Sequence, residues 1–214
     1  MKKKIMLLDG GMGQELIKNS KSAPHPLWST YVMLEEPDLV RKAHVDFIEA
    51  GASIITLNTY STTPERLEAN DLLDKFSFFQ KKAIDLAREA IDHTQKNILI
   101  AGCLPPLVAS YRPDKAPEYD RCVDLYLQIV REQESFVDLF ICETMASIKE
   151  AKAAVVAAKT SGKAVWCGLT LEDNEKCELR SGEKLIDSVN ELQSVGQEEF
   201  LLNCSFPEVI DKGM

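Results

Sequence analysis

The sequence has no long hydrophobic run, no basic excess and no closely spaced pair of cysteines. No window approaches the roughly 18 apolar residues of a membrane-spanning helix, so we expect no contact with a membrane. The apolar run at residues 5–8 ends at Asp9, short of the roughly 7–15 residues of a signal-peptide core. Lys and Arg number 25 against 34 Asp and Glu, a formal net charge of -9. This balance argues against binding to nucleic acid, which needs a basic surface.

The cysteines do not form a disulfide or zinc-finger pattern. There are six, at positions 103, 122, 142, 167, 177 and 204, with no C-x-x-C pair. Several lie in apolar runs, where a reduced, buried cysteine is common, and we therefore expect a cytoplasmic protein. The length of 214 residues, with 45% hydrophobic and 28% charged residues, suits one ordinary globular domain.

Short apolar runs alternate with longer segments of helical periodicity. The short runs have the length and the Ile, Val and Phe content of strands buried on both faces. They lie at residues 5–8, 53–57, 98–102, 138–142, 164–169 and 200–203. The helical stripes lie at residues 40–50, 79–90, 119–130, 148–158 and 185–192. Pro37 fits the first turn of the first of these helices, and Gly51 fits its C-terminal cap.

Six predicted strands alternating with five predicted helices indicate βαβ units around a parallel sheet. An open doubly wound sheet and a closed (β/α)8 barrel both give this alternation, and composition alone does not choose between them. Eight barrel units typically need about 250 residues, so the length weakens the case for a complete barrel. The chain shows no internal repeat and no linker that would divide it.

Polar residues follow the predicted strands, at the edge where parallel α/β folds build their sites. In chain order they are Asp9, Asn58, Cys103, Glu143, Thr170 and Asn203-Cys204. Asp9 before two glycines also fits an ordinary turn, and Cys204 also fits a small core residue. Glu143 ends an apolar strand, where an unpaired carboxylate is costly, so it indicates a site more strongly. The glycines at 10, 11 and 13 have neither the dinucleotide-binding spacing nor the P-loop Lys-Ser/Thr.

An ordered set of segments resembles the homocysteine S-methyltransferase family. The segments are LLDGGMGQEL at 7–16, LWS at 27–29, the helix end at 44–51, IITLNTY at 54–60, CETM at 142–145, LRSGE at 179–183 and Asn203-Cys204 followed by Pro207. Each is weak alone, but together they span essentially the whole chain. The resemblance implies a (β/α)8 TIM-type barrel, here partial with about six of its eight strand–helix units. It also implies a single homocysteine-binding domain over residues 1–214 that is incomplete at its C-terminal end.

The resemblance further implies a methyltransferase that moves a methyl group to the sulfur of homocysteine and so forms methionine. The family uses a catalytic zinc held by three cysteine thiolates, and Cys204 matches the first of them. The positions that match substrate-binding residues are Asp9, Gly10, Gly11, Trp28, Asn58 and Glu143. Asp9 and Glu143 match the positions that hold the substrate ammonium, and Trp28 and Asn58 match positions that line the pocket.

The implied chemistry suits these residue types. A free thiol with a pKa near about 8.5 is mostly protonated at neutral pH, and zinc removes the proton by coordination. The fourth position of a three-thiolate site would take the substrate sulfur, so no general base is expected. Asp9 and Glu143 would make charge-assisted hydrogen bonds to the amine. Gly10 and Gly11, without a Cβ, would let backbone N–H groups approach the substrate carboxylate.

The sequence departs from the family pattern at the zinc ligands. The other two family cysteines lie in a Gly-Gly-Cys-Cys motif after the Asn-Cys, and this sequence has no Cys-Cys pair. The cysteines at 103, 142 and 167 match no family ligand. We therefore expect either a fragment of a longer enzyme, favoured because Asp9, Glu143 and Cys204 are kept, or a natural short form without activity.

Two other functions remain open from the sequence. One is a non-catalytic amino-acid-binding barrel, and the other is the homocysteine-binding module of a multidomain methionine synthase. The methyl donor is not indicated, and S-methylmethionine, S-adenosylmethionine, betaine and methylfolate all fit. An incomplete barrel would expose the edges of its first and sixth strands, which favours association into a homo-oligomer.

Overall fold

Five strands alternate with helices along the chain in the computed structural model, which describes residues 5–22, 25–27, 29–174 and 176–213. The strands are β1 (Ile54–Thr56), β2 (Leu99–Leu104), β3 (Leu139–Met145), β4 (Ala164–Leu169) and β5 (Glu199–Leu202). They form a parallel sheet in the order β1-β2-β3-β4-β5, so each strand pairs with the next along the chain. This sequential order is that of βαβ units added one after another, as a barrel requires.

By its internal contacts the chain divides into two compact units. The N-terminal unit comprises Met1–Gly102 with Glu132–Asp138, and the C-terminal unit comprises Cys103–Arg131 with Leu139–Met214. The first boundary falls within β2. In the N-terminal unit β1 pairs with β2 from Ile54 opposite Leu99 onward. In the C-terminal unit β3, β4 and β5 pair in parallel.

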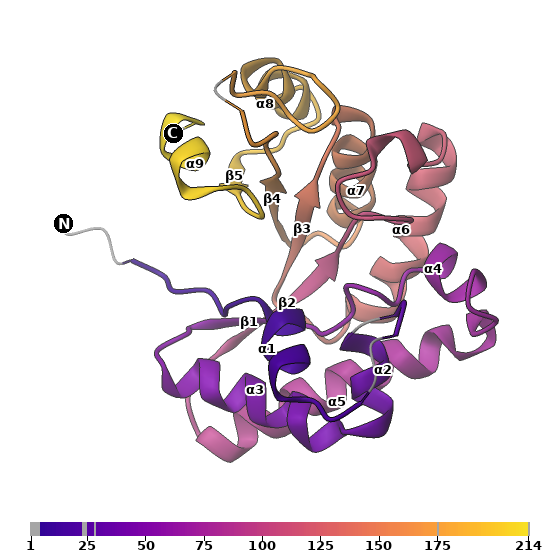
Figure 1. Cartoon of the computed structure of the whole chain (residues 1–214), viewed down its shortest axis with the longest axis vertical. Helices are drawn as coiled ribbons and strands as arrows, with labels where there is room; N and C mark the ends of the chain where they lie inside the picture. Colours follow the sequence, from indigo (N-terminus) through magenta and orange to yellow (C-terminus); the bar gives the residue numbers. More distant parts are fainter. Residues whose placement is uncertain (1–4, 23–24, 28, 175, 214) are drawn as a thin grey trace. The chain divides into compact units, whose positions relative to one another are not determined.

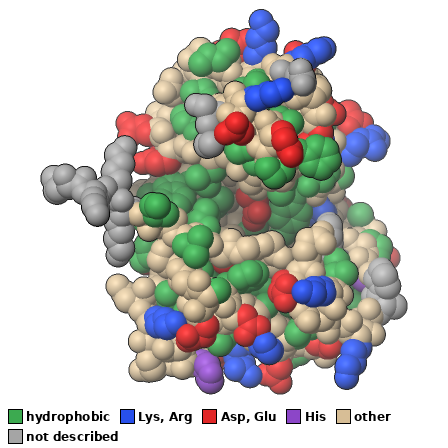
Figure 2. Space-filling model, turned by 60° about the vertical axis from the view of Figure 1, so that its left-hand side comes forward, with side chains coloured by type: hydrophobic (Ala, Val, Ile, Leu, Met, Phe, Trp, Pro, Cys, Tyr) green, Lys and Arg blue, Asp and Glu red, His purple; other side chains and the backbone are tan. Residues whose placement is uncertain are grey.

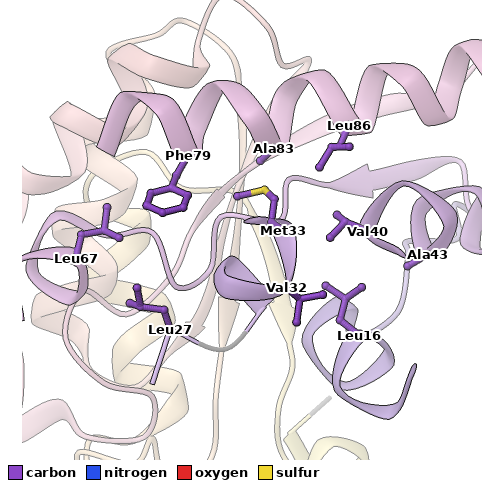
Figure 3. Close-up of a cluster of buried hydrophobic side chains, with 10 residues drawn as sticks. All are labelled: Leu16, Leu27, Val32, Met33, Val40, Ala43, Leu67, Phe79, Ala83 and Leu86. Atoms are coloured by element: carbon purple, nitrogen blue, oxygen red, sulfur yellow. The ribbon is translucent and has the colours of Figure 1, made fainter. Parts of the chain in front are cut away.

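Helices supply most of the core of the N-terminal unit. They are α1 (Met12–Asn19), α2 (Ser29–Glu35), α3 (Pro37–Glu49), α4 (Pro64–Glu68) and α5 (Phe76–Thr94), with a 3-10 turn, η1, at Leu73–Lys75. Figure 1 shows α3 running beside the long α5, and these two helices are in contact. Ten buried apolar side chains from α1 to α5 and the α1–α2 connection form one cluster (Figure 3). Phe79 of α5, Leu67 of α4 and Leu27 lie together at one end of that cluster.

The ends of α3 follow the sequence prediction. Pro37 stands in its first turn, where the missing N–H costs no hydrogen bond. After the helix, Gly51 has a φ of 110°, a conformation open to glycine because it has no Cβ. The N–H groups of Ala50 and Gly51 donate to carbonyls of the last turn. The chain is thereby turned back toward β1.

In the C-terminal unit helices cover a sheet of mostly apolar strands. The helices are α6 (Tyr119–Gln133), which ends in the N-terminal unit, α7 (Ile148–Lys159), α8 (Leu185–Gln193) and α9 (Pro207–Gly213), and a 3-10 turn, η2, spans Pro113–Lys115. The α7 helix packs on β3 and β4 through small residues that include Ala151, Ala154 and Ala158 (Figure 1). The Ser147 side chain caps α7 by accepting from the N–H of Glu150.

The predicted first strand at residues 5–8 is wrong as a strand. Only Leu8 pairs with the sheet, through a single parallel bridge to Ile54. The side chains of Ile5, Met6 and Leu7 are 90%, 46% and 51% exposed, so the apolar run is not buried on two faces as the prediction required. The sequence predicts six strands, whereas the described part of the chain has five strands and, in place of the sixth, the single bridge of Leu8.

On the face shown in Figure 2, Lys and Arg side chains are interspersed with Asp and Glu rather than gathered into a stripe. Among the described residues, no helix combines the length and apolar character needed to span a bilayer.

Candidate functional site

Asp9 is tied to the end of β1. Its N–H donates to the carbonyl of Ile54 at 3.1 Å. Its carboxylate accepts from the N–H of Thr56 at 2.7 Å and from the Thr56 hydroxyl at 3.0 Å. The carboxylate therefore joins the segment before α1 to the carboxyl end of β1, which is more than an ordinary turn residue does.

The two glycines after Asp9 differ in what surrounds them. A Cβ on Gly10 would lie 2.7 Å from Cε1 of Phe47, whereas a Cβ on Gly11 would meet nothing closer than 3.9 Å. Only Gly10 is therefore required by packing. Asn58 is buried and donates from its amide to the carbonyl of Ser29 at 3.2 Å. The fourth N-terminal candidate, Trp28, lies outside the described residues.

Glu143 carries a half-buried carboxyl group near the end of β3. The thiol of Cys103, on β2, donates to its Oε1 over 2.8 Å. Burial raises the pKa of the Glu143 carboxyl above its ordinary value, and the hydrogen bond from Cys103 acts in the opposite direction. Within the described chain, Cys103 is the one side chain that bonds this carboxyl, which leaves acceptor capacity for a ligand.

A break in the strand register displaces the residue next to Glu143. The pairing of β3 with β4 shifts between Cys142 and Met145, and Thr144 has a φ of 60°. Such a conformation is unusual for a β-branched residue, and bulges of this kind re-aim side chains next to sites. The side-chain amide of Asn203 holds Thr144 in this conformation. The amide oxygen accepts from the Thr144 N–H and the amide nitrogen donates to the Thr144 hydroxyl, both at 3.1 Å.

Cys204 presents its thiol just after β5. Of the six cysteines it alone is exposed, and its φ is 55°. The hydroxyl of Thr144 donates to its Sγ at 3.3 Å. Its carbonyl accepts from the Thr170 hydroxyl at 3.1 Å and from the Arg180 guanidinium at 3.3 Å. Thr144 of β3 and two residues that follow β4 therefore hold the turn that carries this thiol.

Arg180, from the LRSGE segment, connects the loops around Cys204. Its side chain is only 14% exposed, and it bonds Asp173 at 2.9 Å. It also lies 4.5 Å from the centre of the Tyr111 ring, within the range of a cation–π contact. Burial, and then the neighbouring Cys204, raise the pKa of Tyr111. Sequence reasoning missed both roles, although Arg180 stands in a motif it singled out.

The described residues do not fit a zinc site by themselves. Among them, no three His, Cys, Asp or Glu side chains are placed to hold a metal ion. Cys103, Cys122, Cys142 and Cys167 are buried. Burial raises the pKa of Cys142 well above its ordinary value and that of Cys167 to about 12, so neither thiol ionises near neutral pH. Cys204 is the one candidate thiolate that the site offers.

Comparison with known proteins places this arrangement in a family. The model of the homocysteine S-methyltransferase family matches residues 6–214. The chain belongs to the homocysteine S-methyltransferase family. The homocysteine S-methyltransferase of Escherichia coli K12 is 31% identical over 224 residues, 95% of this chain and 70% of that protein. Homocysteine S-methyltransferase 3 of maize (Zea mays) is 28% identical over 234 residues, 96% of this chain and 67% of the relative.

Solved structures of this family share the fold. The metallated form of the homocysteine methyltransferase MmuM from Escherichia coli superposes with a TM-score of 0.85 at 27% identity, over 99% of this chain and 78% of that one. This confirms the predicted TIM-barrel-type class. The site residues predicted from the family divide between the units: Asp9, Gly10, Gly11 and Asn58 belong to the N-terminal unit, and Glu143 and Cys204 to the C-terminal unit.

Proposed function

We propose that the protein acts in the transfer of a methyl group to the sulfur of homocysteine, which forms methionine. The observation that carries the proposal is the Glu143 carboxyl, half-buried at the end of β3 and bonded by Cys103 alone among the described side chains. A carboxylate in this state is suited to a cationic ligand, since charge-assisted hydrogen bonds are stronger than neutral ones. Homocysteine, the substrate that the family name gives, carries an ammonium group, and we propose that group as the cation.

Asp9 is the second proposed contact of the ammonium group. Both of its oxygens already accept from Thr56, but each carboxylate oxygen has two lone pairs and can accept again. These bonds also fix the direction of the carboxyl group. The backbone at Gly10 and Gly11 is proposed to receive the substrate carboxylate, and Trp28 and Asn58 to line the pocket.

Cys204 is the proposed zinc-binding thiolate. Its thiol is exposed and accepts a hydrogen bond from Thr144, which suits a sulfur that binds a ligand. Since the described residues supply no further thiolate in reach, we derive no step of the reaction through the metal. The proposal assigns this chain the binding and orientation of the amino acid.

The setting of the reaction is part of the same proposal. All six cysteines are free thiols, which suits a reducing compartment such as the cytoplasm. The methyl donor is left open between S-methylmethionine, S-adenosylmethionine, betaine and methylfolate.

Homocysteine binding to a Glu143→Gln variant tests the proposal. The variant keeps the shape of the side chain but removes its charge. We expect homocysteine to bind about 10- to 100-fold more weakly, as the loss of a hydrogen bond to a charged group predicts. Glu198→Gln, which neutralises an exposed carboxylate of the same unit, should bind as the parent does. Equal affinity of parent and Glu143→Gln in calorimetry would refute the assigned role.

A further inference from the structure

The Cys103–Glu143 hydrogen bond is a contact to which the proposed function assigns no role of its own. Cys103 is buried on β2 and Glu143 lies on β3, and the two strands are neighbours in the sheet. The thiol donates to Oε1 over 2.8 Å. Cys103 matches no zinc ligand of the family, so its thiol needs another explanation.

We infer that Cys103 is a positioning residue for Glu143, whose thiol keeps the carboxylate ionised and turned so that Oε2 receives the ammonium group of the amino-acid substrate. The inference rests on the proposed function of Glu143. A thiol donates one hydrogen, and a bond to the charged form of an acid favours that form. Burial alone would leave the carboxyl protonated to a higher pH, and a protonated carboxyl binds an ammonium group poorly.

The other titratable groups near Glu143 do not replace Cys103 in this role. Cys142, its neighbour on β3, is buried, and its pKa is raised well above the ordinary value by burial, then by Cys167 and by Glu143 itself. Burial raises the pKa of Cys167, on β4, to about 12. Both thiols stay neutral while Glu143 titrates. Among the described groups, the hydrogen bond from Cys103 is the contact that lowers the pKa of Glu143.

The first measurement follows the carboxyl group directly. Glutamate labelled with ¹³C at the side-chain carboxyl is incorporated into the full chain, and the Glu143 signal is assigned by its loss in Glu143→Gln. In Cys103→Ala the midpoint of the Glu143 titration should rise by about one pH unit, as expected for one lost hydrogen bond to a charge. In Cys103→Ser, which restores a donor, the midpoint should return to the parent value or below.

Two further variants control this measurement. Cys122→Ala removes another buried thiol of the same unit, one that donates to the carbonyl of Pro117, and should leave the midpoint unchanged. Cys103→Val also removes the hydrogen-bond donor but fills the space of the Cys103 side chain. If the alanine variant does not fold, the titration midpoint of Glu143 is measured in Cys103→Val instead. An unchanged midpoint in a folded Cys103→Ala or Cys103→Val protein would overturn the inference.

The second measurement links the pair to the substrate. Homocysteine affinity is determined by calorimetry across the pH range of the Glu143 titration. Below the parent midpoint Cys103→Ala should bind about tenfold more weakly than the parent, and well above the shifted midpoint equally, because one pH unit corresponds to one factor of ten. Cys103→Ser should follow the parent profile. An effect that does not vary with pH would reflect structure alone and would count against the inference.

The outcomes separate the inference from the proposed function. If Glu143→Gln binds homocysteine as the parent does, the proposed role of Glu143 fails, and the substrate part of the inference fails with it. If Glu143→Gln weakens binding but the Cys103 variants change neither the titration nor the affinity profile, the proposed function stands and the inference alone is wrong.

Discussion

The two units differ in how they treat the polar groups at the ends of their strands. In the N-terminal unit both oxygens of Asp9 accept from Thr56, and Asn58 donates to a backbone carbonyl. Among the described residues of this unit, the non-glycine residues with positive φ are Asp71 and Gln95, which follow α4 and α5. Residues with a left-handed backbone conformation commonly follow the end of a helix. The polar groups of this unit therefore serve mainly to build it.

In the C-terminal unit three of the four described non-glycine residues with positive φ gather around one thiol, and the fourth is Cys177. Thr144 and Cys204 have φ values of 60° and 55° and are joined by a hydrogen bond, and Tyr111, with a φ of 60°, stands next to Cys204. Each such residue costs on the order of 1–3 kcal/mol and persists only where its surroundings hold it. The difference teaches that hydrogen-bonded polar groups build the N-terminal unit, whereas left-handed residues of the C-terminal unit lie beside the thiol that we propose as a zinc ligand.

The sharpest test of the reactive role of the C-terminal unit is turnover. The 214-residue chain should form no methionine above background, because Cys204 is its one match to a set of three thiolates. Extension with a segment that carries Gly-Gly-Cys-Cys should restore zinc binding and methionine formation together. Both proteins are assayed with S-methylmethionine, S-adenosylmethionine, betaine and methylfolate, and their zinc content is measured. Chelator-sensitive turnover by the 214 residues would mean that the ligands lie elsewhere, first among Cys103, Cys142 and Cys167.

The scaffold role of the N-terminal unit is tested by its paired glycines. Gly10→Ala should destabilise the protein by about 1–3 kcal/mol, the usual cost of overpacking, because the new Cβ would lie 2.7 Å from the Phe47 ring. Gly11→Ala, with nothing nearer than 3.9 Å, should change stability little. The measurement is the free energy of unfolding in denaturant. Equal effects at the two positions would break the distinction between them.

Much of the fold could be predicted from periodicity, and the failures have physical causes. The five interior apolar runs became β1 to β5, and the five stripes became α3 and α5 to α8. Runs buried between helices carry a strong signal because both faces are apolar. The run at 5–8 failed because apolar composition does not show whether a segment is covered. Helices α1, α2, α4 and α9 were missed because each has only five to eight residues, too short for a clear period.

The candidate site was predictable only where a residue stands at a strand end. Glu143 and Cys204 do so, and both carry the features expected of functional groups. The partners that hold them include Cys103, Tyr111 and Arg180. Cys103 contacts Glu143 between neighbouring strands, whereas the contacts of Tyr111 and Arg180 depend on loop geometry. A loop conformation such as the left-handed backbone of Tyr111 produces no periodic pattern in a sequence. The contacts of such loop residues could therefore be seen only in the structure.

Some buried polar atoms of the N-terminal unit have no hydrogen-bond partner among the described residues, and His44 is the titratable case with a shifted pKa. His44, in α3, is fully buried, and neither ring nitrogen has a hydrogen-bond partner among the described residues. Burial lowers its pKa from 6.5 to about 4. The folded state therefore binds a proton less readily than the unfolded state, so stability present above pH 6.5 is lost as the pH falls toward 4.

The expected loss from His44 is about 2 kcal/mol between pH 7.5 and pH 5. His44→Leu, which removes the titrating ring, should lack this part of the pH dependence and be more stable at pH 5. His93→Leu changes an exposed histidine of α5 and should keep the parent slope. Denaturant unfolding at several pH values gives both slopes, and parallel slopes for parent and His44→Leu would show that His44 is not the cause.

The smallest effect concerns the side chain that holds the strained turn of the C-terminal unit. Arg180 is 14% exposed and contacts Asp173, Tyr111 and the carbonyl of Cys204, whereas Arg112 is 55% exposed and pairs only with Asp114 within the described chain. Arg180→Gln should therefore cost about 1 kcal/mol, more than Arg112→Gln, because exposed ion pairs contribute little. The effect should also be local. Amide hydrogen exchange at residues 203–206 should quicken in Arg180→Gln and not in Arg112→Gln, while β3 and β4 keep their protection. Unchanged exchange at 203–206 would mean that Thr144, Thr170 and Asn203 hold Cys204 in place without the guanidinium.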